Sequence, residues 1–119
     1  MPVYFTYITP QCEKEAKKYG LLSDIQKLAN KIEETQEVGN LWPFPRIFRK
    51  KPLGRNYRLI IGEVPRAEVG ANLLIFWHVY PKSSDKYTEF QNNSQAFEEP
   101  FKEDCKHLDI DRTYAVRVE

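Results

Sequence analysis

The chain has 119 residues, of which 41% are hydrophobic and 29% charged, and its formal net charge at pH 7 is +1. These values are ordinary for one folded globular domain, and they exclude both an intrinsically disordered chain and a protein that attracts nucleic acid by its overall charge. No apolar run approaches the roughly 20 residues of a membrane helix, and the N-terminus lacks a signal peptide's cationic segment, so we expect a cytoplasmic protein without membrane contact.

The N-terminal residues predict a strand and then a helix. Val3–Ile8 is rich in β-branched and aromatic residues and is bounded by prolines, which is typical of a strand. Thr9 is a suitable N-cap, and Pro10 stands at the first helical position, where its missing N–H costs nothing. Gly20 is suited to end this helix in a left-handed conformation.

A second helix is expected directly afterwards. Ser23 followed by Gln26 forms a capping box, and Gly39 is the predicted end of the helix. The apolar residues between them recur at the helical spacing i, i+3, i+4, i+7; they are Ile25, Leu28, Ala29 and Ile32. The two helices therefore predict a hairpin with one apolar stripe.

A meander of strands is predicted next. Residues 41–45 are read as an apolar loop, and residues 46–51 and 57–64 as a strand hairpin with Gly54 in its turn. Residues 73–80 are apolar on both faces, as in a central strand that is covered on both sides.

The last segments are less regular. Residues 81–90 are read as a loop, and residues 91–119 as a short helix followed by a strand at 113–118. The fold class is therefore α+β, with an N-terminal strand and a helical hairpin packed on a small, mostly antiparallel sheet.

Metal and nucleophile chemistry find little support. Cys12, His78, Cys105 and His107 include no closely spaced pair of the zinc-finger kind, and two cysteines in a cytosolic chain are expected to be reduced thiols. Nucleophile elbow, P-loop and dinucleotide-binding motifs are all missing from the sequence. We therefore expect no metal and no cofactor, and we interpret His78, inside the apolar segment 73–80, as a structural histidine.

A cluster of cations surrounds the predicted turn at Gly54, although the chain is near neutral. Two interpretations are open: the cations flank the turn and protect a sheet edge from aggregation, or they face phosphate. Tyr80 and Tyr87 bracket a loop with two lysines, an arrangement that suits base stacking next to phosphate, and we favour the second interpretation. The cluster comprises Arg46, Arg49, Lys50, Lys51, Arg55 and Arg58, and the loop lysines are Lys82 and Lys86.

The element order and the strings "GRNYRLIIGEV" and "LLIFWHVYPKSSDKY" resemble the RelE/ParE superfamily of bacterial toxins. The resemblance covers residues 3–90. It implies a family domain at residues 1–90 and a C-terminal extension or linker at residues 91–119. The activity that it implies is a ribosome-dependent messenger RNA endoribonuclease that needs no metal. In that reaction the ribose 2′-hydroxyl attacks the adjacent phosphate.

The resemblance also implies roles for individual residues. Arg58 in "NYRL" matches the arginine that stabilises the phosphorane, and Tyr87 matches the tyrosine that stacks on a base. The implied partners are RNA on the ribosome and an antitoxin protein. The implied catalytic set is Arg49, Lys51, Arg58, Lys82 and Tyr87. The cation cluster and the loop beside it predict the nucleic-acid-binding set Arg46, Lys50, Arg55, Tyr80 and Lys86.

Three functions stay open because the loop departs from the family pattern. Ser83, Ser84 and Asp85 stand where the family often carries the arginine that acts as general acid. The chain is then an active nuclease, an inactive RelE-like module that binds nucleic acid or protein, or a ParE-like topoisomerase poison. The inactive module would stand alone or form the N-terminal part of a larger nucleic-acid enzyme.

Overall fold

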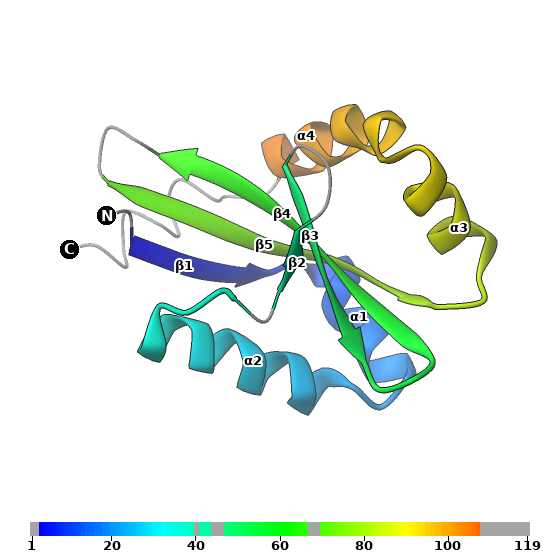
Figure 1. The fold of residues 1–119 in the computed structure, drawn as a ribbon, viewed down its shortest axis with the longest axis horizontal. Coiled ribbons are helices and arrows are strands. Elements are labelled where there is room, and N and C mark those ends of the chain that lie inside the picture. Colours follow the sequence, from blue (N-terminus) through cyan, green and yellow to red (C-terminus); the bar gives the residue numbers. More distant parts are fainter. Residues whose placement is uncertain (1–2, 40, 44–46, 67–69, 108–119) are drawn as a thin grey trace.

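The computed structural model describes residues 3–39, 41–43, 47–66 and 70–107, in which a mixed sheet lies between two layers of helices (Figure 1). The N-terminal half comprises β1 (Val3–Ile8), α1 (Pro10–Lys18), α2 (Leu22–Thr35) and β2 (Trp42–Pro43). The C-terminal half comprises β3 (Phe48–Leu53), β4 (Tyr57–Arg66), β5 (Ala71–Pro81), α3 (Asp85–Asn92), the 3₁₀ helix η2 (Ser94–Phe97) and α4 (Glu98–His107). The predicted α+β class and the order of strand, helical hairpin and meander are confirmed.

The strands form one sheet in the order β1-β5-β4-β3-β2. β1 runs parallel to β5, and the other neighbouring strands are antiparallel. The helical hairpin between β1 and the meander supplies the long connection that brings the first and last strands together in parallel. β5 is buried on both faces, as its apolar sequence predicts.

One face of the sheet is covered by the helical hairpin α1 and α2. The Thr9 hydroxyl accepts a hydrogen bond from the Cys12 N–H (3.0 Å), so the predicted cap of α1 is confirmed. Ile25 and Ile32 of α2 pack with Leu59 and Phe76 of the sheet in one cluster. We call this side of the sheet the hairpin face.

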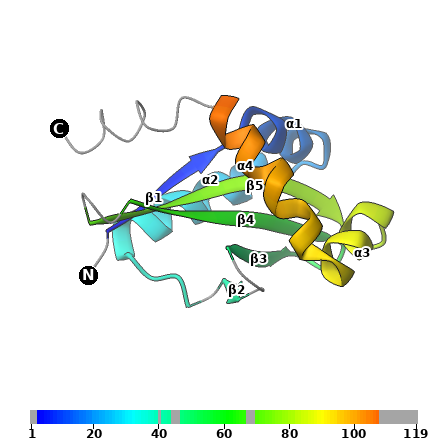
Figure 2. The same ribbon diagram turned by 90° about the horizontal axis from the view of Figure 1, so that it is seen from above.

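The opposite face is covered by α3, η2 and α4 (Figures 1 and 2). Phe90, Phe97 and Phe101 pack here against Phe48 and Trp77, and we call this side the C-terminal face. The Phe101 ring stands edge-on to both Phe48 (5.6 Å) and Trp77 (5.1 Å). A boundary at residue 90 therefore cuts through a single hydrophobic cluster.

The ends of α2 differ from the prediction. The helix begins at Leu22, so Ser23 lies within its first turn and no side chain caps it. It ends at Thr35, four residues before Gly39, because Gln36 adopts a left-handed conformation (φ 60°). The Gln36 amide then pairs with the backbone N–H (2.7 Å) and C=O (3.0 Å) of Tyr4, which closes the free edge of β1.

Two further segments differ from the sequence-based interpretation. Trp42 and Pro43 pair with β3 instead of lying in a loop. The segment expected as a loop contains α3, where the Ser84 hydroxyl accepts from the Tyr87 N–H (3.2 Å) as an N-cap. The expected short helix after residue 91 is α4, and the strand expected at 113–118 lies outside the described residues.

Candidate nucleic-acid interface

The cations of β3 are divided between the two faces of the sheet. Side chains alternate along a strand, and Phe48 lies on the C-terminal face while Leu53 lies on the hairpin face. Arg49 and Lys51 therefore lie on the hairpin face, and Lys50 lies on the C-terminal face. The structure does not bring the predicted catalytic cations of β3 to the side on which Arg58 lies.

Arg49 is paired with a carboxylate. Its Nε donates to Glu63 Oε1 at 2.8 Å, and the two side chains are 25% and 23% exposed. The pair lies across neighbouring strands on the hairpin face. Glu63 therefore offsets the charge that Arg49 would offer to a phosphate.

Arg58 lies on the C-terminal face and is only 8% exposed. It is paired in register with Tyr80 of β5, and its Nη1 donates to the Tyr57 carbonyl oxygen (2.8 Å). The guanidinium therefore lies below the surface, and an RNA phosphate could reach it only after local rearrangement.

Tyr87 is buried as well. It is 2% exposed within α3, and its hydroxyl is hydrogen bonded to Lys50 Nζ (3.2 Å) and Gln91 Nε2 (3.1 Å). Lys50 also lies over the rings of Tyr87 and Trp42, at 5.6 Å from each centroid. Trp42 is 47% exposed, so it offers the accessible ring that Tyr87 lacks.

Two basic segments far apart in sequence meet at one end of the sheet. The turn between β3 and β4 lies against the loop after β5, where Lys82 N–H donates to the Asn56 carbonyl oxygen (2.7 Å). Arg55 and Lys82 are both exposed there. An open hollow of about 460 Å³ lies between the segments, lined by Asn56, Tyr57, Pro81, Lys82 and Ser83.

An aromatic pair extends this region toward α1. The Tyr57 ring packs on Tyr19 with centroids 4.6 Å apart, and Lys18 Nζ lies 5.6 Å from the Tyr19 centroid. We call Lys18, Tyr57, Arg55 and Lys82 together the basic end. Neither Lys18 nor Tyr57 is among the binding residues predicted from the sequence. Tyr57 alternates with Leu59 and Ile61 along β4 and therefore lies on the hairpin face.

The remaining predicted binding residues are distributed elsewhere. Tyr80 and Lys86 line a different hollow, together with Glu89 and Asp104. Arg46 lies outside the described residues. Of the predicted set, the structure brings together Arg55 and Lys82 at the basic end.

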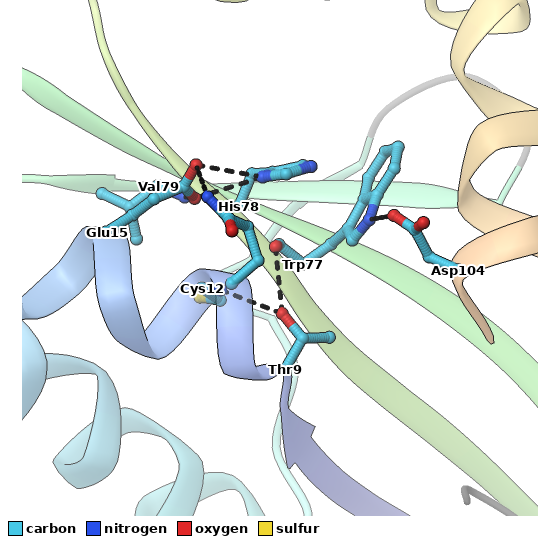
Figure 3. Close-up of polar contacts among 8 residues, drawn as sticks. Thr9, Cys12, Glu15, Trp77, His78, Val79 and Asp104 are labelled. Atoms are coloured by element: carbon cyan, nitrogen blue, oxygen red, sulfur yellow. Dashed lines mark hydrogen bonds and ion pairs between the residues drawn. The ribbon is translucent and has the colours of Figure 1, made fainter. Parts of the chain in front are cut away.

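A polar cluster that sequence analysis missed closes the free edge of β5 beyond β1 (Figure 3). Glu15 of α1 accepts from the Val79 N–H (2.9 Å) and lies 3.1 Å from His78 Nδ1. Burial alone would raise the pKa of Glu15, but the hydrogen bonds from His78 and Val79 outweigh it and lower the pKa. This pairing gives His78 a structural role, as the sequence suggested.

The pairing of β5 with β4 contains an irregularity close to this cluster. Ile60 pairs with His78 and Ile61 with Phe76, so Trp77 is an extra residue in β5. The Thr9 hydroxyl donates to the Trp77 carbonyl oxygen (3.2 Å), and the Trp77 indole N–H donates to Asp104 Oδ2 (2.8 Å; Figure 3). These bonds connect α1 and α4 to the bulge.

The thiols show no sign of activation. Burial raises the pKa of Cys12 to about 12 and that of Cys105 to about 11, so both stay protonated at neutral pH. Among the described residues, no three His, Cys, Asp or Glu side chains lie close enough together to hold a metal ion. None of the helices within the described ranges is both long and apolar enough to cross a membrane.

No family model, no curated protein and no solved structure matches this chain.

Proposed function

We propose that the chain is a RelE-like module that binds single-stranded RNA at its basic end without cutting it. The observation that carries the proposal is the contact between the β3–β4 turn and the loop after β5, where Lys82 lines an open hollow and the exposed Arg55 directly precedes Asn56, which lines it too. The order of strand, helical hairpin and meander supports the RelE-like part.

The basic end combines the two features that single-stranded nucleic acid requires. Exposed cations neutralise phosphates, and this electrostatic term supplies most of the affinity when no sequence is read. Aromatic rings stack on bases of any sequence, and Tyr57 lines the hollow beside Lys82. Asp85 is exposed at the start of α3 and opposes phosphate binding on that side.

The geometry gives less support to nuclease chemistry. A phosphorane is stabilised by cations that converge on one point in a water-poor site. Here Arg49 lies on the other face in an ion pair, and both Arg58 and Tyr87 are buried. Binding therefore requires less rearrangement of this structure than cleavage does.

We expect the double variant Arg55→Ala with Lys82→Ala to bind a fluorescein-labelled single-stranded RNA about tenfold more weakly than the parent protein. Loss of two phosphate contacts should also reduce the slope of log affinity against log salt by about 1.4. Fluorescence anisotropy at several salt concentrations measures both quantities.

The control removes the same two charges elsewhere. Arg49→Ala with Lys102→Ala changes the net charge equally, but one residue is ion-paired on the hairpin face and the other is exposed on α4. Equal weakening by both double variants would mean that only net charge matters, and the basic end would lose its support.

A second experiment separates binding from cleavage. We expect purified, programmed ribosomes to retain intact messenger RNA in the presence of the protein. Specific cleavage that Arg58→Ala abolishes would replace the binding module with the ribosome-dependent nuclease.

A further inference from the structure

A second hollow lies on the C-terminal face, between β5, α3 and α4, and the proposed RNA-binding site does not include it. Its volume is about 240 Å³, which suits a ligand of only a few non-hydrogen atoms. The floor is aromatic and well buried, formed by Trp77 (3% exposed), Tyr80 (9%) and Phe97 (8%).

The charged side chains of this hollow are predominantly acidic. Glu89 from α3 and Asp104 from α4 line it, against Lys86 and the imidazole of His78, which is already paired with Glu15. An anionic ligand would meet two carboxylates, whereas a cationic ligand would be attracted by them. The Trp77 indole N–H donates a hydrogen bond to Asp104 (Figure 3), and this bond holds the Asp104 carboxylate in place beside the hollow.

The Tyr80 hydroxyl is the second observation that points to a ligand. Tyr80 is 9% exposed and lines the hollow, and within the described part of the chain no hydrogen bond joins its hydroxyl to another residue, so the hydroxyl is open to a ligand or to water there. Burial raises the pKa of this phenol, and the carboxylates of Glu15, Glu89 and Asp104 raise it further. The hydroxyl is therefore neutral, and its oxygen can accept a hydrogen bond from a ligand.

The neighbouring rings hold Tyr80 in place. His78 stacks on Tyr80 with centroids 4.9 Å apart and planes at 16°, and Glu15 fixes the His78 ring through Nδ1. The hydroxyl is thus presented to the hollow by a rigid support instead of a mobile side chain.

We propose that this hollow binds a primary ammonium group on a short apolar chain. The ammonium donates to the Tyr80 hydroxyl and lies between the carboxylates of Glu89 and Asp104, and the alkyl chain packs on Trp77 and Phe97. Three N–H donors match these acceptors, and aromatic rings attract an adjacent cation.

Titration of ¹⁵N-labelled protein with n-butylammonium chloride tests the site directly. The Trp77 indole N–H, bonded to Asp104, is the reporter, and the indole of Trp42 on β2 is the internal reference. We expect a saturable shift of the Trp77 resonance with a dissociation constant on the order of 1 mM for this small ligand. Sodium chloride at equal concentration and n-butanol, which has no charge, should leave it unchanged.

Two variants test the contacts without touching the reporter. Glu89→Gln and Tyr80→Phe should each weaken binding about fivefold, because each removes one interaction and keeps the size of the side chain. Glu99→Gln removes a carboxylate of α4 that is paired with Lys102 and does not line the hollow, and should bind like the parent protein.

The outcomes are distinct. Nα-acetyl-lysine amide keeps the side-chain ammonium group and represents a lysine within a protein. Stronger binding of this compound than of n-butylammonium would support the site and identify its ligand as a protein lysine, and the reverse would identify a free amine. Equal shifts with n-butanol, or no saturable shift with either amine, would overturn the proposal. Binding that appears only in Lys86→Met would also overturn it, since Lys86 would then fill the hollow itself.

Discussion

The Gly62→Ala variant is expected to lower the free energy of unfolding by about 3 kcal/mol, the upper part of the range for overpacking a core. A Cβ atom at Gly62 of β4 would overlap the Phe101 ring of α4. The ring has little room to move, because Phe101 is 1% exposed and packs edge-on against Phe48 and Trp77. Urea denaturation followed by circular dichroism measures the loss.

A matched control and a rescue separate this clash from a general effect of replacing glycine. A Cβ at Gly39 would meet no atom within 4 Å, so Gly39→Ala should leave stability nearly unchanged. Phe101→Ala alone should cost about 3–5 kcal/mol, and adding Gly62→Ala to it should cost little more, because the clashing ring is gone. Additive losses in the double variant would mean that α4 does not pack on β4 as described.

The stabilities of the Gly62 and Phe101 variants also show whether α4 folds together with the sheet. If Gly62 and Phe101 are coupled, α4 belongs to the same cooperative unit as the sheet. The C-terminal face of the sheet is then covered by the protein's own helices, and Arg58 and Tyr87 are buried for a structural reason. Their burial is the main argument against assigning them to an exposed nuclease site.

The regular elements were readable from the sequence because their signals are local. The β-branched and aromatic residues of Val3–Ile8, the Thr9 cap and the doubly apolar segment 73–80 each specify a structure without distant partners. Phe90, Phe97 and Phe101 come from three separate elements, α3, η2 and α4, so no single periodicity in the sequence predicts that they pack together. The resemblance ends at residue 90 and therefore gives no reason to expect that Phe97 and Phe101 complete the core.

The candidate site was harder to predict because it depends on register. Whether Arg49 lies on the same face as Arg58 is decided by the pairing of Leu53 with Tyr57, and thus by the length of the turn around Gly54. A change of register by one residue would have brought Arg49 and Lys51 to the other face. The contact between Lys82 and Asn56 likewise requires knowing that the start of β4 pairs with the end of β5.

Glu15 was beyond sequence reasoning for a different reason. Its partners His78 and Val79 lie more than 60 positions away in the chain, and a charged residue on a thin amphipathic helix is usually solvated. In the structure, Glu15 accepts a hydrogen bond from the free edge of β5. We expect its replacement to cause the second large loss of stability.

Glu15→Ala should lower the free energy of unfolding at neutral pH by about 2–3 kcal/mol, because a buried backbone donor loses a charged acceptor. Val79 is 1% exposed, so water cannot easily replace the carboxylate at its N–H. Glu13→Ala is the matched control on the same helix: Glu13 forms an exposed pair with Lys17, worth at most about 0.5 kcal/mol. Similar losses in both variants would show that α1 is sensitive to any such change and that the edge contact is unimportant.

The pH dependence gives an independent test of the same contact. The pKa of Glu15 is lower in the folded protein than its ordinary value of 4.5, so the folded state favours the carboxylate. The resulting stabilisation is complete above the unfolded-state pKa and is lost as the pH falls through the folded-state pKa. The isosteric Glu15→Gln variant does not titrate, so its stability deficit relative to the parent should be greatest near neutral pH and should shrink as the pH falls below about 4.5. A deficit that stays constant between neutral and acidic pH would contradict this expectation. It would mean that the negative charge of Glu15 does not stabilise the β5 edge.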